Sequence, residues 1–183
     1  MVIGATGDPL SIRADLLVLP VNAAGTVGSD AGRLLRARFP TIWSALLGDL
    51  AATGARPGAL IAIPAAAGPA FALLVVRERA RDYARAVDLD RGIRTIAELL
   101  RTRPRFGVVS IAPLVRDEDE LSRERSVALI ERAMRGLPTT VYAFVDDEEP
   151  AIRSHAVRLP DAEAARGLHA GRLDDILRRP VRR

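Results

Sequence analysis

The chain contains no cysteine and no lysine, and it has only two histidines. The missing cysteines exclude disulfide bonds, thiolate nucleophiles and zinc sites with sulfur ligands. His155 and His169 both lie far along the chain, so a metal site built from histidine is not expected, and we predict neither a metal nor a cofactor. All 27 basic residues are arginine, which excludes any mechanism that needs a lysine.

The chain also lacks the run of about 18 apolar residues that a membrane-spanning helix needs. Its first residues do not show the basic segment and apolar stretch that are typical of a signal peptide. We therefore expect a cytoplasmic protein without membrane contact. Aromatic residues make up only 4% of the chain, but 49% of it is hydrophobic, and its 183 residues fit one domain with a real core.

The net charge of +4 is confined to the end of the chain. Residues 151–183 contain eight arginines and four acids, whereas the preceding residues contain 19 of each. A basic tail can attract nucleic-acid phosphates, but no aromatic residues alternate with these arginines, so a solvated tail is the stronger expectation. We predict a core domain over 1–146 and a C-terminal extension over 147–183, and the sequence leaves the oligomeric state open.

The residues from Leu16 to Val21 are apolar without alternation, as in a strand that helices cover on both faces. Turn residues and apolar periodicity divide the rest of the chain into further elements. They predict strands over 2–3, 15–21, 59–63, 71–76, 107–112 and 139–145, and helices over 30–38, 42–52, 88–101 and 122–135. This order predicts an α/β fold, a three-layer α/β/α sandwich with a mixed, mostly parallel sheet. Further on, 152–159 suggests an edge strand and 161–179 suggests short helices.

The candidate site lies at the end of the strand that finishes at Val21. In largely parallel sheets, ligands bind beyond the carboxyl ends of the strands. Asn22 stands at this end and is followed by a loop from Gly25 to Gly28. Glycine has no side chain to keep a ligand away from the backbone, so this loop is a candidate binding loop.

The segment from Gly7 to Asn22 resembles the macrodomain family of ADP-ribose-binding modules. It contains the Gly7-Asp8 turn, an acidic residue near the start of the strand and a Val-Asn strand end, at the spacing of the family. The glycine loop with Arg38-Phe39-Pro40 downstream is most similar to the branch that contains the DNA ADP-ribosyl glycohydrolase antitoxins. Ala112-Pro113-Leu114 and the helix residues 129–134 also match, so the resemblance covers roughly residues 1–146.

This resemblance implies a role for each matching residue. Asp8 would accept a hydrogen bond from the adenine amino group. Asn22 would face the distal ribose, and it is the candidate catalytic residue if a water held between it and the ligand's phosphate attacks. The resemblance also implies ligand contacts from two loops. The backbone of the first would pass close to the ribose and diphosphate, and its residues are Gly25, Thr26, Val27 and Gly28. The second loop of the cleft would contribute Val115 and Arg116.

The chain departs from the family pattern in three places, the first of which is Leu19, where family members usually carry an asparagine. The second loop is glycine-rich in the family, but here residues 115–121 carry four acids, which we expect to be solvated. One carboxylate about 5 Å from one phosphate charge would weaken the binding of a phosphate ligand by on the order of 3 kcal/mol at a dielectric constant of ~20. Arg116 would offset part of this repulsion if its side chain points inward. The lysine of the antitoxin branch is replaced by Arg77, which cannot give up its proton and which we expect in a solvated loop.

Two functions follow from these observations. In the first, the chain binds ADP-ribose, a related nucleotide or an ADP-ribosylated macromolecule, with weak or no ADP-ribosyl hydrolase activity. In the second, it is a degenerate macrodomain that binds no nucleotide and acts as a protein-interaction or regulatory subunit. Asp8 and Asn22 favour the first function, and the acidic second loop favours the second.

Overall fold

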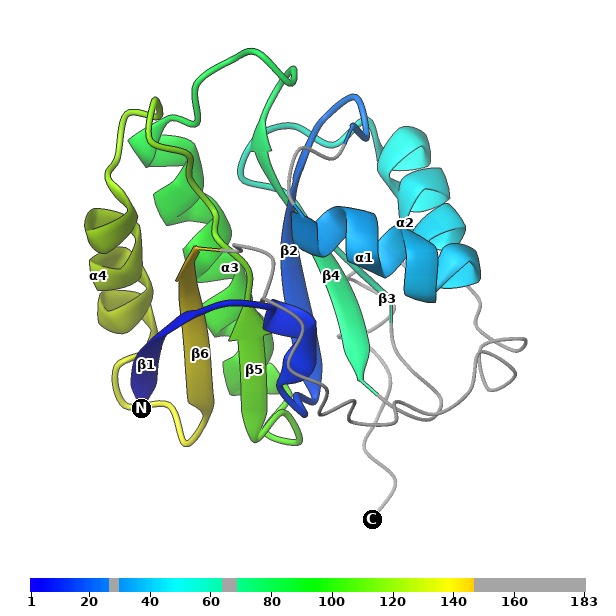
Figure 1. Cartoon of the computed structure of the whole chain (residues 1–183). Coiled ribbons are helices and arrows are strands. Elements are labelled where there is room, and N and C mark those ends of the chain that lie inside the picture. The colour runs from blue at the N-terminus through cyan, green and yellow to red at the C-terminus, as the bar shows by residue number, and fades with distance from the viewer. Residues whose placement is uncertain (27–29, 64–68, 147–183) are drawn as a thin grey trace.

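The protein is a three-layer α/β/α sandwich, as the sequence predicts. The computed structural model describes residues 1–26, 30–63 and 69–146 (Figure 1). The strands are β1 (Val2–Thr6), β2 (Leu16–Asn22), β3 (Leu60–Ile63), β4 (Ala70–Arg77), β5 (Val108–Ile111) and β6 (Thr140–Asp146), and the helices are α1 (Asp30–Arg38), α2 (Pro40–Thr53), α3 (Ala86–Thr102) and α4 (Arg123–Met134). The strand and helices suggested after residue 150, both histidines and the basic tail lie outside the described residues.

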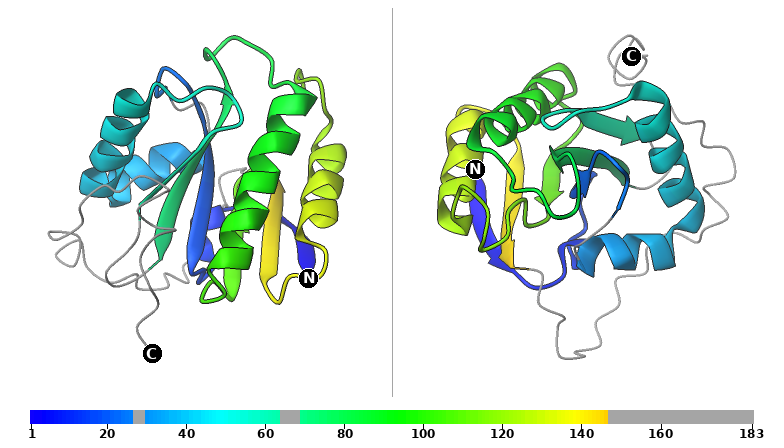
Figure 2. Two further views of the ribbon diagram at one scale, coloured as in Figure 1. Left: turned by 180° about the vertical axis from the view of Figure 1, so that it is seen from behind. Right: turned by 90° about the horizontal axis from the view of Figure 1, so that it is seen from above.

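The six strands form one sheet in the order β1-β6-β5-β2-β4-β3. Only β3, at one edge, runs antiparallel to its neighbour β4, and the other four strand pairs are parallel. The carboxyl ends of five strands therefore meet at one edge of the sheet, which is seen from above in the right-hand view of Figure 2. This is the edge at which the sequence places the candidate site.

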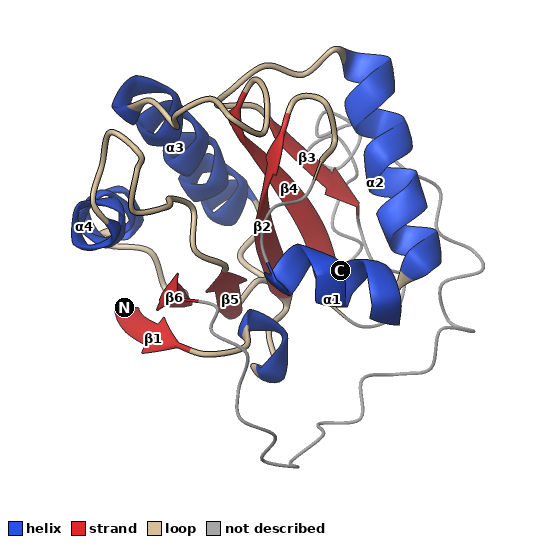
Figure 3. Cartoon of the chain, turned by 45° about the horizontal axis from the view of Figure 1, so that its top comes forward, coloured by secondary structure: helices blue, strands red, loops and turns tan. Residues whose placement is uncertain are grey.

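The central strand β2 contributes to two separate hydrophobic cores. Leu16 and Val18 pack in the core under α3 and α4, whereas Leu17, Leu19 and Val21 pack in the core under α1 and α2. Figure 3 shows these two helix pairs on opposite sides of the sheet. The continuous apolar run is thus explained by burial on both faces, which confirms the prediction made from its lack of alternation.

The second core also takes up the two aromatic residues near the start of α2. Trp43 is buried, and the ring of Phe39 lies 5.2 Å from the ring of Phe71 on β4. These rings stabilise the contact between α2 and the sheet. None of the helices in the described part of the chain is both long and apolar enough to cross a membrane.

Candidate functional site

A cavity of about 180 Å³ lies at the carboxyl edge of the sheet, between the ends of β2 and β4 and the chain after β5. Four of the residues predicted from the sequence line it: Asn22, Thr26, Val115 and Arg116. The other predicted contacts lie elsewhere. Asp8 and Gly25 are not among its lining residues, and Val27 and Gly28 fall outside the described part of the chain.

The cavity exists because the sheet divides at Pro20. Strand β2 pairs with β5 only as far as Val18, but it pairs with β4 as far as Asn22. Pro20 has no N–H group, so it cannot donate a ladder hydrogen bond at the point where β5 departs. The chain after β5 then turns away through Pro113, and both prolines line the resulting gap.

Asn22 closes the loop that follows β2. Its side-chain oxygen accepts a hydrogen bond from the N–H of Thr26 at 2.9 Å, and the residue is 4% exposed. A register shift after Val21 sets Asn22 opposite Arg77 on β4. The amide nitrogen of Asn22 has no hydrogen-bond partner among the described residues, so it is available as a donor at the cavity wall.

Gly25 shapes the same loop instead of lining the cavity. Its φ angle is 75°, a conformation that residues with a side chain rarely adopt. A Cβ atom at this position would lie 3.0 Å from the Leu47 side chain on α2. The glycine is therefore explained by backbone conformation and by close packing on α2.

Asp8 begins the short 3-10 helix at Pro9–Ser11. Its Oδ1 accepts a hydrogen bond from the N–H of Leu10 at 2.8 Å, and its Oδ2 lies 3.7 Å from the Arg38 guanidinium. The turn is fixed to the sheet because the buried Ser110 hydroxyl on β5 donates to the Pro9 carbonyl at 2.8 Å. The carboxylate thus has a capping role at the carboxyl end of β1, whatever else it binds.

Arg116 contributes to the cavity wall, but its guanidinium is directed to the neighbouring loop. It donates to the carbonyl oxygens of Ala80 and Asp82 at 3.0 and 2.9 Å, and its Nε lies 3.1 Å from the Glu118 carboxylate. The condition under which Arg116 would offset phosphate repulsion, an inward-pointing guanidinium, is therefore not fulfilled in this arrangement. Its positive charge still lies beside the cavity.

Asp119 is the central residue of the second loop, and its side chain is fully buried. Its carboxylate accepts hydrogen bonds from the Arg77 guanidinium at 2.8 Å, from the Ala84 N–H at 2.8 Å and from the Arg116 N–H at 2.6 Å. It thereby joins the end of β4, the loop after β4 and the second loop. The prediction of solvated surface is wrong for this residue and for Arg77, which is buried at the end of β4.

The neighbouring acidic side chains also form hydrogen bonds or ion pairs. Glu120 accepts a hydrogen bond from the N–H of Ala86 at the start of α3, where the helix dipole favours negative charge. Asp117 pairs with Arg123 at 2.9 Å, and Arg123 also pairs with Asp146 at the end of β6. None of these acids lines the cavity, and Asp119, which bonds to two residues that do, is paired with the Arg77 guanidinium.

The similarity of this chain to known proteins lies in its structure. No family model matches the sequence, and no curated protein matches it. Among solved structures, the macrodomain of Thermus aquaticus DarG superposes with a TM-score of 0.69 at 16% identity, covering 81% of this chain and 98% of that one. The macrodomain of Mycobacterium tuberculosis DarG superposes with a TM-score of 0.65 at 17% identity, covering 79% of this chain and 97% of that one. The chain has the macrodomain fold.

A third structure of the same fold is Thermosipho africanus DarTG in complex with ADP-ribose. It matches with a TM-score of 0.62 at 14% identity, and the match covers 83% of this chain but 41% of that one. Identities at this level establish the fold alone. The resemblance to macrodomains noted from the Gly7–Asn22 segment is confirmed at that level.

Within the macrodomain fold, the second loop carries a feature that the sequence did not reveal. Leu114 and Val115 are buried and line the cavity, yet their backbone N–H groups donate no hydrogen bond to any described residue. Buried N–H groups almost always have a partner. Two successive donors at a cavity wall are suited to an anionic ligand.

The titratable groups at the cavity wall are arginines. Burial lowers the pKa of the Arg77 guanidinium from its usual value, and the Asp119 carboxylate acts in the opposite direction. An arginine remains protonated at neutral pH even so. No cluster of three or more acidic or histidine side chains with the geometry of a metal site occurs in the ranges 1–26, 30–63 and 69–146.

Proposed function

We propose that the chain binds ADP-ribose or a related nucleotide in a cleft at the carboxyl edge of the sheet, of which the 180 Å³ cavity is the ribose-phosphate part. The observation that carries this proposal is the set of unused donors on the cavity wall: the Asn22 amide and the N–H groups of Leu114 and Val115. The macrodomain fold supports it, because Thermosipho africanus DarTG, 41% of which matches this chain, is in complex with ADP-ribose.

Each donor has a role in this proposal. The amide of Asn22 donates to a hydroxyl of the distal ribose, and the N–H groups of Leu114 and Val115 donate to the diphosphate. Arg77 and Arg116 add positive charge beside the phosphates, although their hydrogen bonds are made within the protein. Asp8 accepts a hydrogen bond from the adenine amino group at the far end of the cleft, and Thr26 in the loop after β2 lies beside the ribose.

Hydrolysis is proposed to be weak or absent. General acid–base catalysis needs a group with a pKa near the working pH, and the described residues that line the cavity offer no carboxylate, histidine or lysine. Residual turnover would depend on a water held by Asn22 and the ligand's own phosphate. Such an arrangement positions a nucleophile but does not activate it.

One observation favours the second candidate, a degenerate macrodomain that serves as an interaction subunit. Pockets that hold small molecules usually measure about 300–1,000 Å³, and this cavity is smaller. A nucleotide would then have to extend along the surface towards Asp8. The two candidates differ in whether the chain binds nucleotide at all.

Calorimetry with ADP-ribose separates them. Saturable binding in the micromolar range supports the nucleotide proposal, whereas no heat at millimolar ligand rejects it and leaves the interaction subunit. Asn22→Asp keeps the oxygen that holds Thr26 but loses the amide donor, so we expect at least a tenfold loss of affinity. Asp8→Asn keeps the helix cap and tests the adenine contact. Asp117→Asn, on an exposed side chain outside the cavity, is the matched control.

Turnover is tested separately with mono-ADP-ribosylated DNA and protein. We expect slow or undetectable release of ADP-ribose from both substrates. Rapid release would contradict the argument that the cavity lacks an acid or base.

A further inference from the structure

A second cavity, of about 410 Å³, shares Val76 and Arg77 with the first. Its walls come from the turn before β3, the loop after β4 and the first turns of α3. Three more arginines line it: Arg56, Arg85 and Arg91. Of the residues that line this cavity, the proposed nucleotide site uses Arg77 alone.

Two of these arginines have no internal partner. The guanidinium groups of Arg56 and Arg85 make no ion pair or hydrogen bond with any residue in the described ranges. Arg77, by contrast, is held by Asp119, and Arg91 lies 3.4 Å from the Asp88 carboxylate. Unpaired like charges on one cavity wall repel each other, and an anion between them would relieve that repulsion.

The acids in the same wall do not supply that anion. Asp88 is paired with Arg91, and Asp82 accepts a hydrogen bond from the Arg79 N–H at 2.8 Å. Glu78 is exposed and forms no ion pair or hydrogen bond with Arg56 or Arg85. The two unpaired guanidinium groups therefore remain open to a ligand.

Two glycines hold the turn that carries Arg56 close to α3. Gly58 has a φ angle of 88°, and a Cβ atom on it would lie 3.1 Å from the Asp88 carbonyl oxygen. A Cβ atom on Gly92 would lie 2.3 Å from the Leu74 side chain and 3.4 Å from the Gly58 carbonyl oxygen. The Gly58 N–H also donates to the Val75 carbonyl at 2.7 Å. The arginines are thus presented by a closely packed scaffold.

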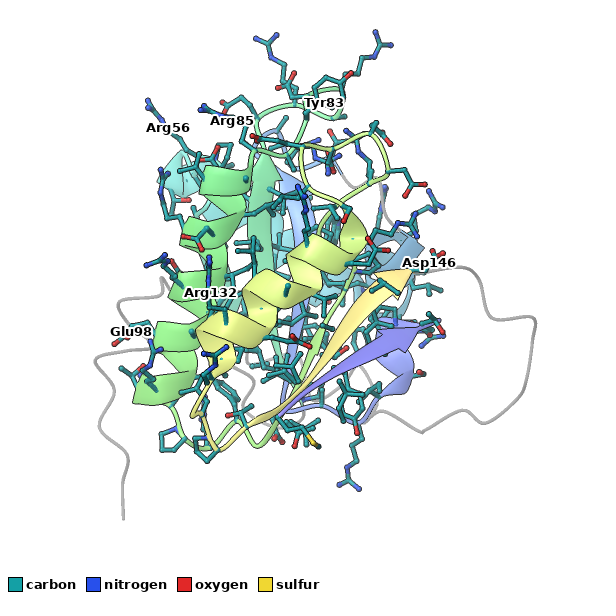
Figure 4. The ribbon with its side chains drawn as sticks, turned by 90° about the vertical axis from the view of Figure 1, so that its left-hand side faces the viewer. Arg56, Tyr83, Arg85, Glu98, Arg132 and Asp146 are labelled. Carbon is teal, nitrogen blue, oxygen red and sulfur yellow. The ribbon has the colours of Figure 1, made fainter. Side chains whose placement is uncertain are left out.

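Tyr83 completes the rim of the cavity. Its side chain is 63% exposed, which is unusual for so large an apolar surface in this chain. In Figure 4, Arg56, Arg85 and Tyr83 lie at the same end of the molecule, well separated from Glu98 and Arg132. Guanidinium groups bind phosphate oxygens in a fork geometry, and exposed aromatic rings stack on planar groups.

We propose that this second cavity is a binding site for a phosphate ester. Arg56 and Arg85 hold the phosphate group, and the planar group attached to it packs on Tyr83. The ester can be a free small molecule or part of a nucleic-acid strand, since both present the same phosphate and ring chemistry. This site adjoins the proposed nucleotide cleft at Val76 and Arg77, but Arg56, Tyr83 and Arg85 line the second cavity and not the first.

The test is an NMR titration of the full chain, in which the amide resonances of Gly58 and Tyr83 report binding. Phenyl phosphate, inorganic phosphate and a short thymidine oligonucleotide are the three probes. We expect saturable shifts with phenyl phosphate, weakened at least tenfold by the double change Arg56→Ala/Arg85→Ala. Arg13→Ala is the matched control and should leave binding unchanged. Arg13 is exposed, lies just before β2 at the opposite edge of the sheet, and has no side-chain partner among the described residues.

The remaining outcomes also decide the proposal. Tyr83→Ala should weaken phenyl phosphate about fivefold or more while leaving inorganic phosphate unchanged, because only the ester has a ring to stack. If the oligonucleotide binds more tightly than phenyl phosphate and its affinity falls with added salt, the natural ligand is a nucleic-acid strand. If phenyl phosphate binds as tightly or more tightly, the natural ligand is a free phosphate ester. Shifts that do not saturate, that survive the double change, or that centre on Asn22 and Leu114 would overturn the proposal.

Discussion

Replacement of Asp119 by alanine tests the buried connection between the two walls of the first cavity. The side chains of Arg77 and Asp119 are 9% and 0% exposed, so the change leaves a buried cation without its partner. Removing one partner of a buried ion pair costs about 3–5 kcal/mol. The N–H groups of Ala84 and Arg116 also lose their acceptor. We therefore expect the free energy of unfolding to fall by at least about 3 kcal/mol.

Urea unfolding, monitored by circular dichroism, measures this loss. For a chain of this size, the expected change corresponds to a fall in melting temperature of about 6–20 °C. Asp119→Asn retains one oxygen acceptor but loses the charge, so its effect should be smaller than that of alanine. Asp117→Ala is the matched control in the same loop. Its side chain is 81% exposed, and surface ion pairs contribute only about 0–1 kcal/mol.

A double change gives a further check on the cause. Arg77→Met in the Asp119→Ala background removes the unpaired cation, so it should recover part of the lost stability. The reasoning is refuted if Asp119→Ala costs no more than Asp117→Ala. It is also refuted if Arg77→Met and Asp119→Ala are simply additive, because the two side chains would then not be coupled.

Three more substitutions test packing, helix propensity and helix capping. Gly92→Ala should lower the free energy of unfolding by about 1–3 kcal/mol, because its Cβ would overlap the Leu74 side chain. Gly48 lies at an exposed position of α2 with open space around it, so Gly48→Ala should raise the free energy of unfolding by about 0.5–1 kcal/mol. Urea unfolding measures both changes. Hydrogen bonds from Ser122 and from its own N–H hold the pKa of Glu124 below its usual value. Any stability from this group is present at neutral pH and is lost as the pH falls through the folded pKa. The Ser122 hydroxyl also caps α4 by accepting a hydrogen bond from the Arg125 N–H at 3.3 Å. Ser122→Ala should therefore cost about 1 kcal/mol of stability. It should also raise the Glu124 pKa in an NMR titration, and an unchanged pKa would contradict the hydrogen bond between Ser122 and Glu124.

The sequence predicts the fold well because its strongest signal is local. The unbroken apolar run in β2 specifies a strand buried on both faces, and the helical periodicity of residues 88–101 specifies a helix against one of them. Both features depend on residues that are neighbours in the chain. Asn22 could be assigned to the carboxyl edge for the same reason.

The electrostatics of the site could not be predicted in this way. Arg77 and Asp119 are 42 positions apart, and nothing in either local sequence indicates that they meet. Composition alone therefore predicts a solvated acidic loop over residues 115–121. One usable signal is present, since a proline within a central strand, as at Pro20, suggests that the sheet is interrupted there. The division of the sheet at this residue creates the cavity.

The pairing of β1 with β6 has a consequence for the order of folding. Val2 lies opposite Val141, so the first strand of the chain reaches its place only beside the last described one. During synthesis, β1 stays unpaired until residues up to Asp146 have left the ribosome, because its partner β6 is the last of the described strands to be made. The Gly7–Asp8 turn is carried by β1. One end of the proposed cleft is therefore assembled only when the translation of the domain is complete.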